Sequence, residues 1–222
     1  MAINWRIFGS GGIETFADIP VHQQFFSAPG RHKFGNRFVK TLFGHPRWFG
    51  ALCDHGPEKL DLVQAEAEFG VPWGTAPLVW VNPSGRVLPY WQPQAPLRRW
   101  VEPGGTDHGA AQINHYMLRS AETFGTKRGL KSPSAGKDRY NQAYWDRADT
   151  EDEIDTSALR HEPEFSALRK AALALPGVAA LHYQCCADHI AQICERAGLR
   201  AEADPRYGAF LAQARQAVPG GC

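Results

Sequence analysis

The chain lacks the features that define several classes of protein. Its five cysteines are an odd number and include no C-x-x-C pair. Neither a zinc ribbon nor a closed disulfide framework is therefore favoured, and reduced cysteines in a cytoplasmic protein are the simpler interpretation. The sequence also has no apolar run of about 18 residues and no basic, then apolar leader, so neither a spanning helix nor a signal peptide is expected.

A strong net charge is also missing. With 24 basic and 23 acidic side chains, the formal net charge of the 222-residue chain is +1. This balance argues against a nucleic-acid partner, which normally requires a basic face, but it allows small anionic ligands and peripheral membrane contact. The length and the hydrophobic content of 43% suit one sizeable core, or one domain with a small helical appendage.

The N-terminal segment has the pattern of a strand that enters a tight turn. Apolar residues alternate over residues 2–9, and residues 9–12 are rich in glycine. On sequence alone, a turn without a ligand is the favoured interpretation. A phosphate-binding P-loop is not supported, because no Gly-Lys-Ser/Thr follows at the required spacing.

Further elements are expected along the chain from local patterns. Residues 37–43 and 48–53 are predicted as strands, and a charged, loop-like stretch from residue 56 contains a possible short helix at 60–69. A hairpin is expected over residues 78–91, with its turn at 82–85. Alanine, leucine and charged residues at helical spacing then predict helices over 164–175, 180–197 and 207–217. These patterns suggest a first domain over residues 1–155 and a helical tail over 156–222.

The stretch 112–129 is predicted as a helix of about five turns. His115 and Arg119 would lie on one face, and the cations Lys127 and Arg128 would meet the negative pole of the helix. On spacing alone, an amphipathic helix with a packed histidine is favoured over a binding site. The residues at three- and four-residue steps would form its buried face: Ile113, Tyr116, Met117, Ser120 and Phe124.

Two groups of residues resemble motifs of a bacterial group of family 2-like glycosyltransferases. The first group resembles the family's "NHY..KS.E.F..K..RG" signature: Asn114, His115, Tyr116, Arg119, Ser120, Glu122, Phe124, Lys127, Arg128 and Gly129. The second resembles its "W..FGSSG" strand and turn: Trp5, Phe8, Gly9, Ser10 and Gly11. Arg119 stands where the family commonly has a lysine, and the last two cations are compressed relative to its spacing.

The resemblance implies an α/β fold, namely part of a GT-A-like mixed sheet with flanking helices and a C-terminal helical extension. In the family the strand and turn follow an Asp-x-Asp metal motif, so residues 1–155 would be the C-terminal part of a catalytic domain whose nucleotide-binding half is apparently missing. The implied reaction transfers a sugar from a nucleotide-sugar donor to a glycan or lipid-linked acceptor in surface polysaccharide biosynthesis, at the inner face of the membrane. This truncated chain would turn over little or nothing.

The resemblance also implies roles for individual residues. His115 would be a ligand of a divalent cation, Mn²⁺ or Mg²⁺. The expected diphosphate-binding residues are Arg119, Ser120, Lys127 and Arg128. The expected sugar- or nucleotide-binding residues are Trp5, Ser10, Gly11, Asn114 and Tyr116. The catalytic base would be Glu14, with Asp152 as the second choice.

Other classes of function stay open on the sequence. Seven tryptophans, twelve phenylalanines and six tyrosines usually fill cores, but flat side chains also stack on sugar rings. A non-catalytic carbohydrate-binding or assembly module is therefore the alternative. A sulfo- or phosphotransferase is a weaker third interpretation, because it would need a phosphate cradle that the sequence does not show.

Overall fold

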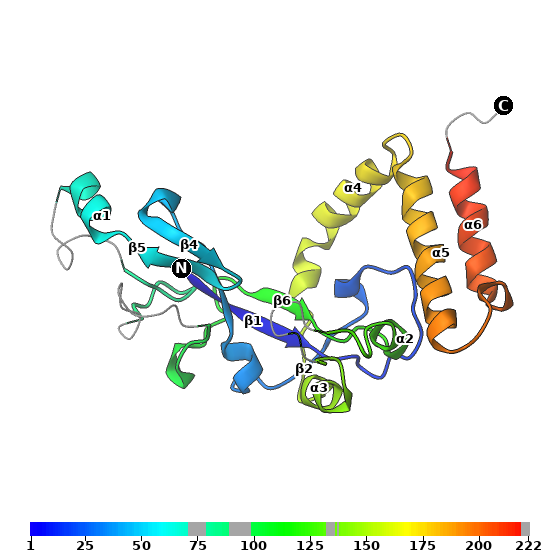
Figure 1. Cartoon of the computed structure of the whole chain (residues 1–222), viewed down its shortest axis with the longest axis horizontal. Coiled ribbons are helices and arrows are strands. Elements are labelled where there is room, and N and C mark those ends of the chain that lie inside the picture. Colours follow the sequence, from blue (N-terminus) through cyan, green and yellow to red (C-terminus); the bar gives the residue numbers. More distant parts are fainter. Residues whose placement is uncertain (71–78, 89–98, 132–135, 137, 219–222) are drawn as a thin grey trace. The chain divides into compact units, whose positions relative to one another are not determined.

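The structure is a computed structural model, and it describes residues 1–70, 79–88, 99–131, 136 and 138–218. Small sheets and flanking helices make up this part of the chain, which confirms the expected α/β class (Figure 1). The strands are β1 (Ala2–Phe8), β2 (Ser27–Ala28), β3 (Val39–Thr41), β4 (Phe49–Cys53), β5 (Gly56–Leu60), β6 (Ile113–Tyr116) and β7 (Glu153–Ile154). The α-helices are α1 (Leu62–Phe69), α2 (Ala121–Gly125), α3 (Gln142–Ala148), α4 (Glu162–Leu173), α5 (Val178–Arg196) and α6 (Pro205–Gln216).

The chain divides into two compact units, and each is built from two segments. The first unit contains Met1–Ile7 and Pro29–His115, and the second contains Phe8–Ala28 and Tyr116–Cys222. The chain therefore passes between the units more than once. The domain boundary suggested after residue 155 lies inside the second unit.

The first unit contains a three-stranded sheet in the order β3-β1-β6. Strand β1 confirms the prediction for residues 2–9, and it runs antiparallel to β3 with Ile3 opposite Lys40. The turn expected at 82–85 is also present, because Val81 and Val87 form an antiparallel bridge across it. Residues 78 and 89–91 of that predicted hairpin lie outside the described residues. The core of this unit consists of Ala2, Val39, Leu88 and Val101, with Trp80 packed against them.

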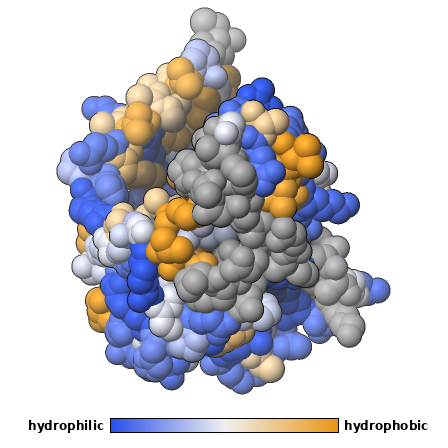
Figure 2. All heavy atoms as spheres, turned by 90° about the vertical axis from the view of Figure 1, so that its left-hand side faces the viewer, coloured by the Kyte–Doolittle hydropathy of each residue, from blue (hydrophilic) through white to orange (hydrophobic). Residues whose placement is uncertain are grey.

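A second hairpin shows where the expectation of a loop from residue 56 was wrong. Strand β5 pairs antiparallel with β4, with Phe49 opposite Leu60 and Cys53 opposite Gly56. The charged side chains of β5 led to the prediction of a loop. A hairpin with one side in solvent tolerates polar residues, so such a sequence can also form a strand. Figure 2 looks onto the side that carries this hairpin and α1, where apolar side chains are scattered among polar ones; Leu52 and Val63 are exposed. Single exposed apolar residues of this kind are ordinary.

The prediction of a long helix over 112–129 was also wrong. Residues 113–116 form strand β6 beside β1, and only a short helix, α2, follows. Arg119 has a left-handed backbone with φ 62°, which a right-handed helix excludes. Ser120 then begins α2 as its N-cap by accepting a hydrogen bond from the N–H of Thr123 (3.3 Å). Leu118 and Phe124 are the fully buried residues of this stretch.

The helical tail confirms the prediction from composition. Helices α4, α5 and α6 match the three expected ranges closely, and α5 and α6 lie side by side (Figure 1). Asp204 caps α6 and Pro205 occupies its first turn, as the physics of helix starts favours. The tail packs through Ile190, Ile193 and Cys194, with Phe16, Tyr207 and Phe210 against them. None of the helices in the described residues is long and apolar enough to cross a membrane.

Two buried asparagines tie the loop before β3 to strand β1. The Asn36 side chain accepts a hydrogen bond from the N–H of Ile7 (2.9 Å) and donates one to the carbonyl of Gly30 (3.1 Å). The Asn4 side chain donates to the carbonyls of Asn36 and Arg37, both at 3.2 Å. Because both asparagines are fully buried, no water can replace these bonds.

We expect Asn36→Ala to lower the free energy of unfolding by about 2 kcal/mol, because it leaves the buried N–H of Ile7 without its acceptor. Urea unfolding followed by circular dichroism measures the loss. Asn141→Ala is a matched control, since it removes only the exposed N-cap of α3 and should cost about 1 kcal/mol. Equal losses in the two variants would contradict the role of Asn36.

Candidate functional site

The two motifs found in the sequence lie next to each other in the structure. Strand β1 is a direct neighbour of β6 in the three-stranded sheet. Beyond β1, the carbonyls of Ile13 and Glu14 accept hydrogen bonds from the N–H groups of Ala121 and Glu122, both at 3.0 Å. Segments about a hundred residues apart are thus joined along their backbones.

The glycine-rich turn is held from within the second unit. The N–H of Ser10 donates to the Asp149 carboxylate (2.7 Å), and its hydroxyl accepts from the N–H of Gly12 (3.1 Å). Gly11 has a left-handed φ of 59°, which favours glycine. Ser10 is only 2% exposed. The contacts described for Ser10 are those of a tight turn, and the binding role of Ser10 and Gly11 stays a prediction.

Trp5 and His115 are in ring contact within the first unit. Their centroids are 4.4 Å apart in an edge-to-face arrangement, and Trp5 also stacks on Phe38 (5.1 Å) and His55 (5.7 Å). The charged nitrogen of Lys40 lies 5.9 Å from the Trp5 ring centroid. His115 therefore packs against an aromatic cluster, and among the described residues it belongs to no group of three converging metal ligands.

The cations of the signature have different surroundings. Arg119 is exposed and Lys127 is half-buried. Burial lowers the pKa of Lys127, and the nearby positive charge of Arg119 lowers it further. Arg128 is exposed and turns toward α3, where its guanidinium donates to the side chain of Gln142 (3.3 Å). Arg119 and Lys127 are thus the pair whose charges act on each other, while Ser120 serves α2 as a cap.

His189 on α5 joins this region, and the sequence analysis did not identify it. Its Nε2 atom lies 3.1 Å from the Thr123 hydroxyl, and its ring meets Phe16 edge-on with centroids 4.7 Å apart. Burial lowers the pKa of His189, and the positive charges of Arg119 and Lys127 act in the same direction. No local pattern marks this histidine, because only the packing of α5 brings it to the signature.

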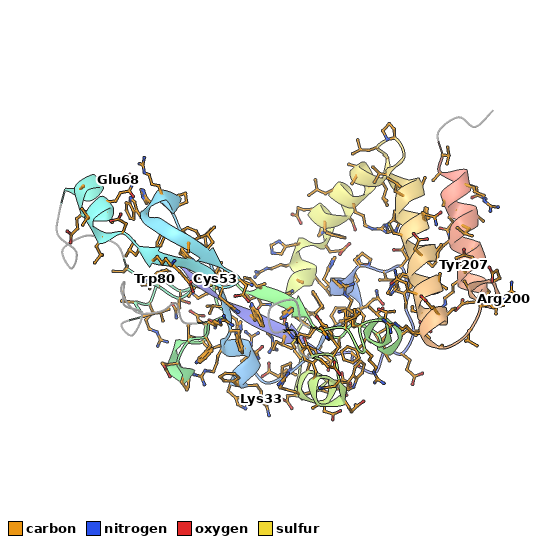
Figure 3. The ribbon with its side chains drawn as sticks, in the orientation of Figure 1. Lys33, Cys53, Glu68, Trp80, Arg200 and Tyr207 are labelled. Carbon is orange, nitrogen blue, oxygen red and sulfur yellow. The ribbon has the colours of Figure 1, made fainter. Side chains whose placement is uncertain are left out.

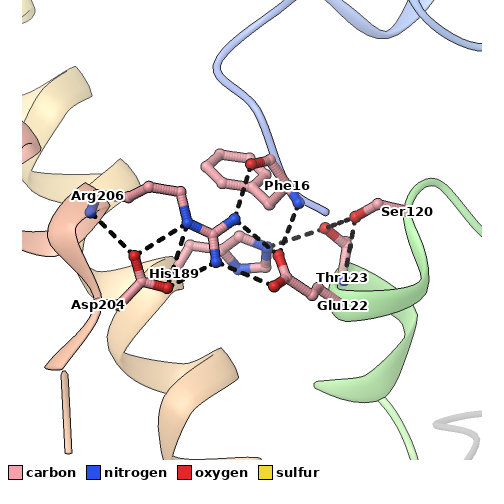
Figure 4. A network of polar contacts seen from close by, with 7 residues as sticks. All are labelled: Phe16, Ser120, Glu122, Thr123, His189, Asp204 and Arg206. Atoms are coloured by element: carbon pink, nitrogen blue, oxygen red, sulfur yellow. Dashed lines mark hydrogen bonds and ion pairs between the residues drawn. The ribbon is translucent and has the colours of Figure 1, made fainter. Parts of the chain in front are cut away.

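Glu122 of the signature is part of an ion-pair network with α6 (Figure 4). The Arg206 guanidinium donates to both carboxylate oxygens of Glu122 at 2.9 Å and to the Asp204 carboxylate at 2.7 Å. The N–H of Phe16 also donates to Glu122 (2.7 Å). The hydrogen bonds from Arg206 hold the pKa of Glu122 below its ordinary value despite partial burial. Glu122 is therefore a structural carboxylate.

The remaining predicted residues are Glu14, Asp152, Asn114 and Tyr116. Glu14 is exposed, and it meets the signature through its backbone carbonyl. Asp152 is exposed too, close to β7. The Asn114 side chain accepts a hydrogen bond from Gln112 (2.8 Å), and the ring of Tyr116 stacks on Phe8 with centroids 4.8 Å apart. The choice of Glu14 or Asp152 as a base stays a prediction.

Comparisons with protein-family models, with curated proteins and with solved structures found no match to this chain. Its function is therefore inferred from the pattern of its residues and from the contacts that the described residues make.

Replacing Arg206 with alanine should lower the free energy of unfolding by about 2–4 kcal/mol, because the partly buried Glu122 and Asp204 carboxylates lose their shared partner. Arg200→Ala is the matched control. Arg200 lies in the connection from α5 to α6, at the right-hand edge of Figure 3, and its ion pair with Glu202 is well exposed, with side chains 87% and 66% accessible. That variant should change the stability by less than about 0.5 kcal/mol. Urea unfolding of both proteins checks the difference.

The ion pair between Glu122 and Arg206 also predicts that the stability of the protein depends on pH. A carboxylate whose pKa is lowered in the folded state stabilises the protein above its ordinary pKa, and this contribution is lost as the pH falls through the folded value. The stability difference between the wild type and Glu122→Gln should therefore be full at pH 6 and shrink below the ordinary value of 4.5. Urea unfolding at several pH values measures it, and a constant difference down to pH 3 would show that Glu122 gains nothing from its charge.

Proposed function

We propose that this chain belongs to the family 2-like glycosyltransferases with a GT-A-like fold. It would take part in moving a sugar from a nucleotide-sugar donor to a glycan or lipid-linked acceptor in surface polysaccharide biosynthesis. The observation that carries the proposal is the adjacency of the two motifs that resemble this family. In the first unit Trp5 touches His115, and in the second unit Phe8 stacks on Tyr116.

The cations of the signature suit one part of this chemistry, which is neutralising the negative charge of the departing diphosphate. A departing nucleoside diphosphate needs positive charge and hydrogen-bond donors, which arginine and lysine supply. Arg119 and Lys127 are the better candidates, because the positive charge of Arg119 is close enough to act on Lys127, while Arg128 is engaged with Gln142. The left-handed backbone of Arg119 adds support, since sparsely populated backbone conformations cluster at functional sites.

The divalent cation implied by the resemblance stays a prediction. His115 would contribute an imidazole nitrogen to it, and a hard cation such as Mg²⁺ would also take several oxygen ligands. Among the described residues, no group of three converging His, Cys, Asp or Glu side chains contains His115. The proposal therefore assigns the diphosphate to the chain's own cations.

A carbohydrate-binding module remains the alternative because of an aromatic surface in the first unit. Phe34 and Trp100 are 53% and 39% exposed, and their ring centroids are 5.9 Å apart. Phe38 lies against both rings. Exposed flat side chains of this kind can stack on sugar rings, and such binding would need no nucleotide.

Calorimetric titration with nucleoside diphosphates, with and without Mn²⁺, tests the proposal. We expect weak binding of at least one diphosphate, and a loss of about tenfold or more in affinity in Arg119→Ala and in Lys127→Ala, or about 1.4 kcal/mol each. Arg200→Ala, a change at an exposed arginine of the tail, should leave the affinity unchanged.

Titration with oligosaccharides then separates the two candidates. Sugar binding that needs no nucleotide and disappears in the double variant Phe34→Ala/Trp100→Ala would replace the transferase with the binding module. The transferase proposal would also be contradicted if the chain bound none of the nucleoside diphosphates.

A further inference from the structure

Three side chains that can bind a metal converge in the second unit, and none of them belongs to the signature. Asp18 comes from the segment Phe8–Ala28, while His182 and Cys186 lie one turn apart on the same face of α5. One possible ligand atom of each residue lies within 4.8 Å of those of the other two. The group thus combines an oxygen, a nitrogen and a sulfur from two separate segments.

The contacts meet at a single nitrogen atom. His182 Nε2 lies 2.9 Å from Asp18 Oδ2 and 4.0 Å from the sulfur of Cys186. In a Cys-His-Asp catalytic triad the thiol and the carboxylate would use different ring nitrogens. Here both partners face the same nitrogen, which is the arrangement of ligands around a common cation.

The three side chains are partly buried and partly open to solvent. Cys186 is 7% exposed, while the side chains of Asp18 and His182 are 24% and 29% accessible. The Arg169 guanidinium lies 3.8 Å from Oδ2 of Asp18. His182 Nε2 is closer to the same oxygen atom, at 2.9 Å. Burial, and then the negative charge of Asp18, raise the pKa of the Cys186 thiol to about 11. A bound cation would have to displace that proton into solvent.

We propose that Asp18, His182 and Cys186 form a binding site for a zinc ion. Zinc accepts carboxylate, imidazole and thiolate ligands in tetrahedral geometry, and three protein ligands leave the fourth position to water. The thiolate distinguishes this site from one for Mn²⁺ or Mg²⁺, which favour oxygen ligands. The ion would fasten the segment that carries the glycine-rich turn to helix α5.

Metal titration of the whole chain tests the site without reference to any catalytic activity. Under reducing conditions, zinc is titrated in competition with a chromophoric chelator, and Co²⁺ replaces it for spectroscopy. We expect one zinc per chain and a near-ultraviolet thiolate-to-cobalt band. Cys186→Ser should remove that band and weaken zinc binding by more than about a hundredfold, because losing a direct ligand should cost more than losing an outer-shell partner.

Cys185→Ser is the matched control, because Cys185 is the neighbouring cysteine on α5 and is exposed. It should keep the cobalt band and the zinc affinity. Asp18→Asn and His182→Asn provide variants that leave the thiol in place, and circular dichroism verifies that each variant is folded. The proposal is overturned if the wild type binds no zinc, if the folded Asp18 and His182 variants bind as tightly as the wild type, or if the cobalt band depends on Cys185.

Discussion

The ion pair between Glu122 and Arg206 holds together segments of the second unit that are far apart in the sequence. Glu122 belongs to the signature, Arg206 to the tail, and the N–H and carbonyl of Phe16 bond to one partner each. A planar guanidinium can serve two carboxylates and a carbonyl at once, which an ammonium group cannot do with fixed geometry. Arg206 therefore adds a polar link between the tail and the signature to the apolar packing of Phe16 on α5 and α6.

The tail also contacts the signature through α5. Helix α5 packs beside α6, and its His189 lies against Thr123 and Phe16. Burial, and then the nearby positive charges, lower the pKa of His189, so the neutral imidazole is favoured in a region that already holds Arg119 and Lys127. A neutral ring limits the repulsion among these groups while it still offers a nitrogen for hydrogen bonding.

The sequence predicted elements whose signal is local and missed those that distant partners decide. Strand β1 and the tail helices follow from alternation and helical spacing. The prediction of a single helix over 112–129 failed because apolar residues at three- and four-residue steps also arise where a strand, a turn and a short helix follow one another. Its true structure depends on pairing with β1 and on the left-handed backbone of Arg119. His189 and Arg206 could not be assigned, since their partners are 66 and 84 residues away.

The segment Phe8–Ala28 links the separate features of the second unit. Its glycine turn is held by Asp149, its Phe16 joins the network of Glu122 and Arg206, and its Asp18 meets His182 on α5. The segment contains little regular secondary structure. The contacts of its side chains and backbone with other segments therefore fix its path. A cation at Asp18 would add a bond to the same segment that the Glu122 network already anchors. Its effect would therefore extend along this backbone to the glycine turn, because a chain fixed at three points has few alternative paths between them.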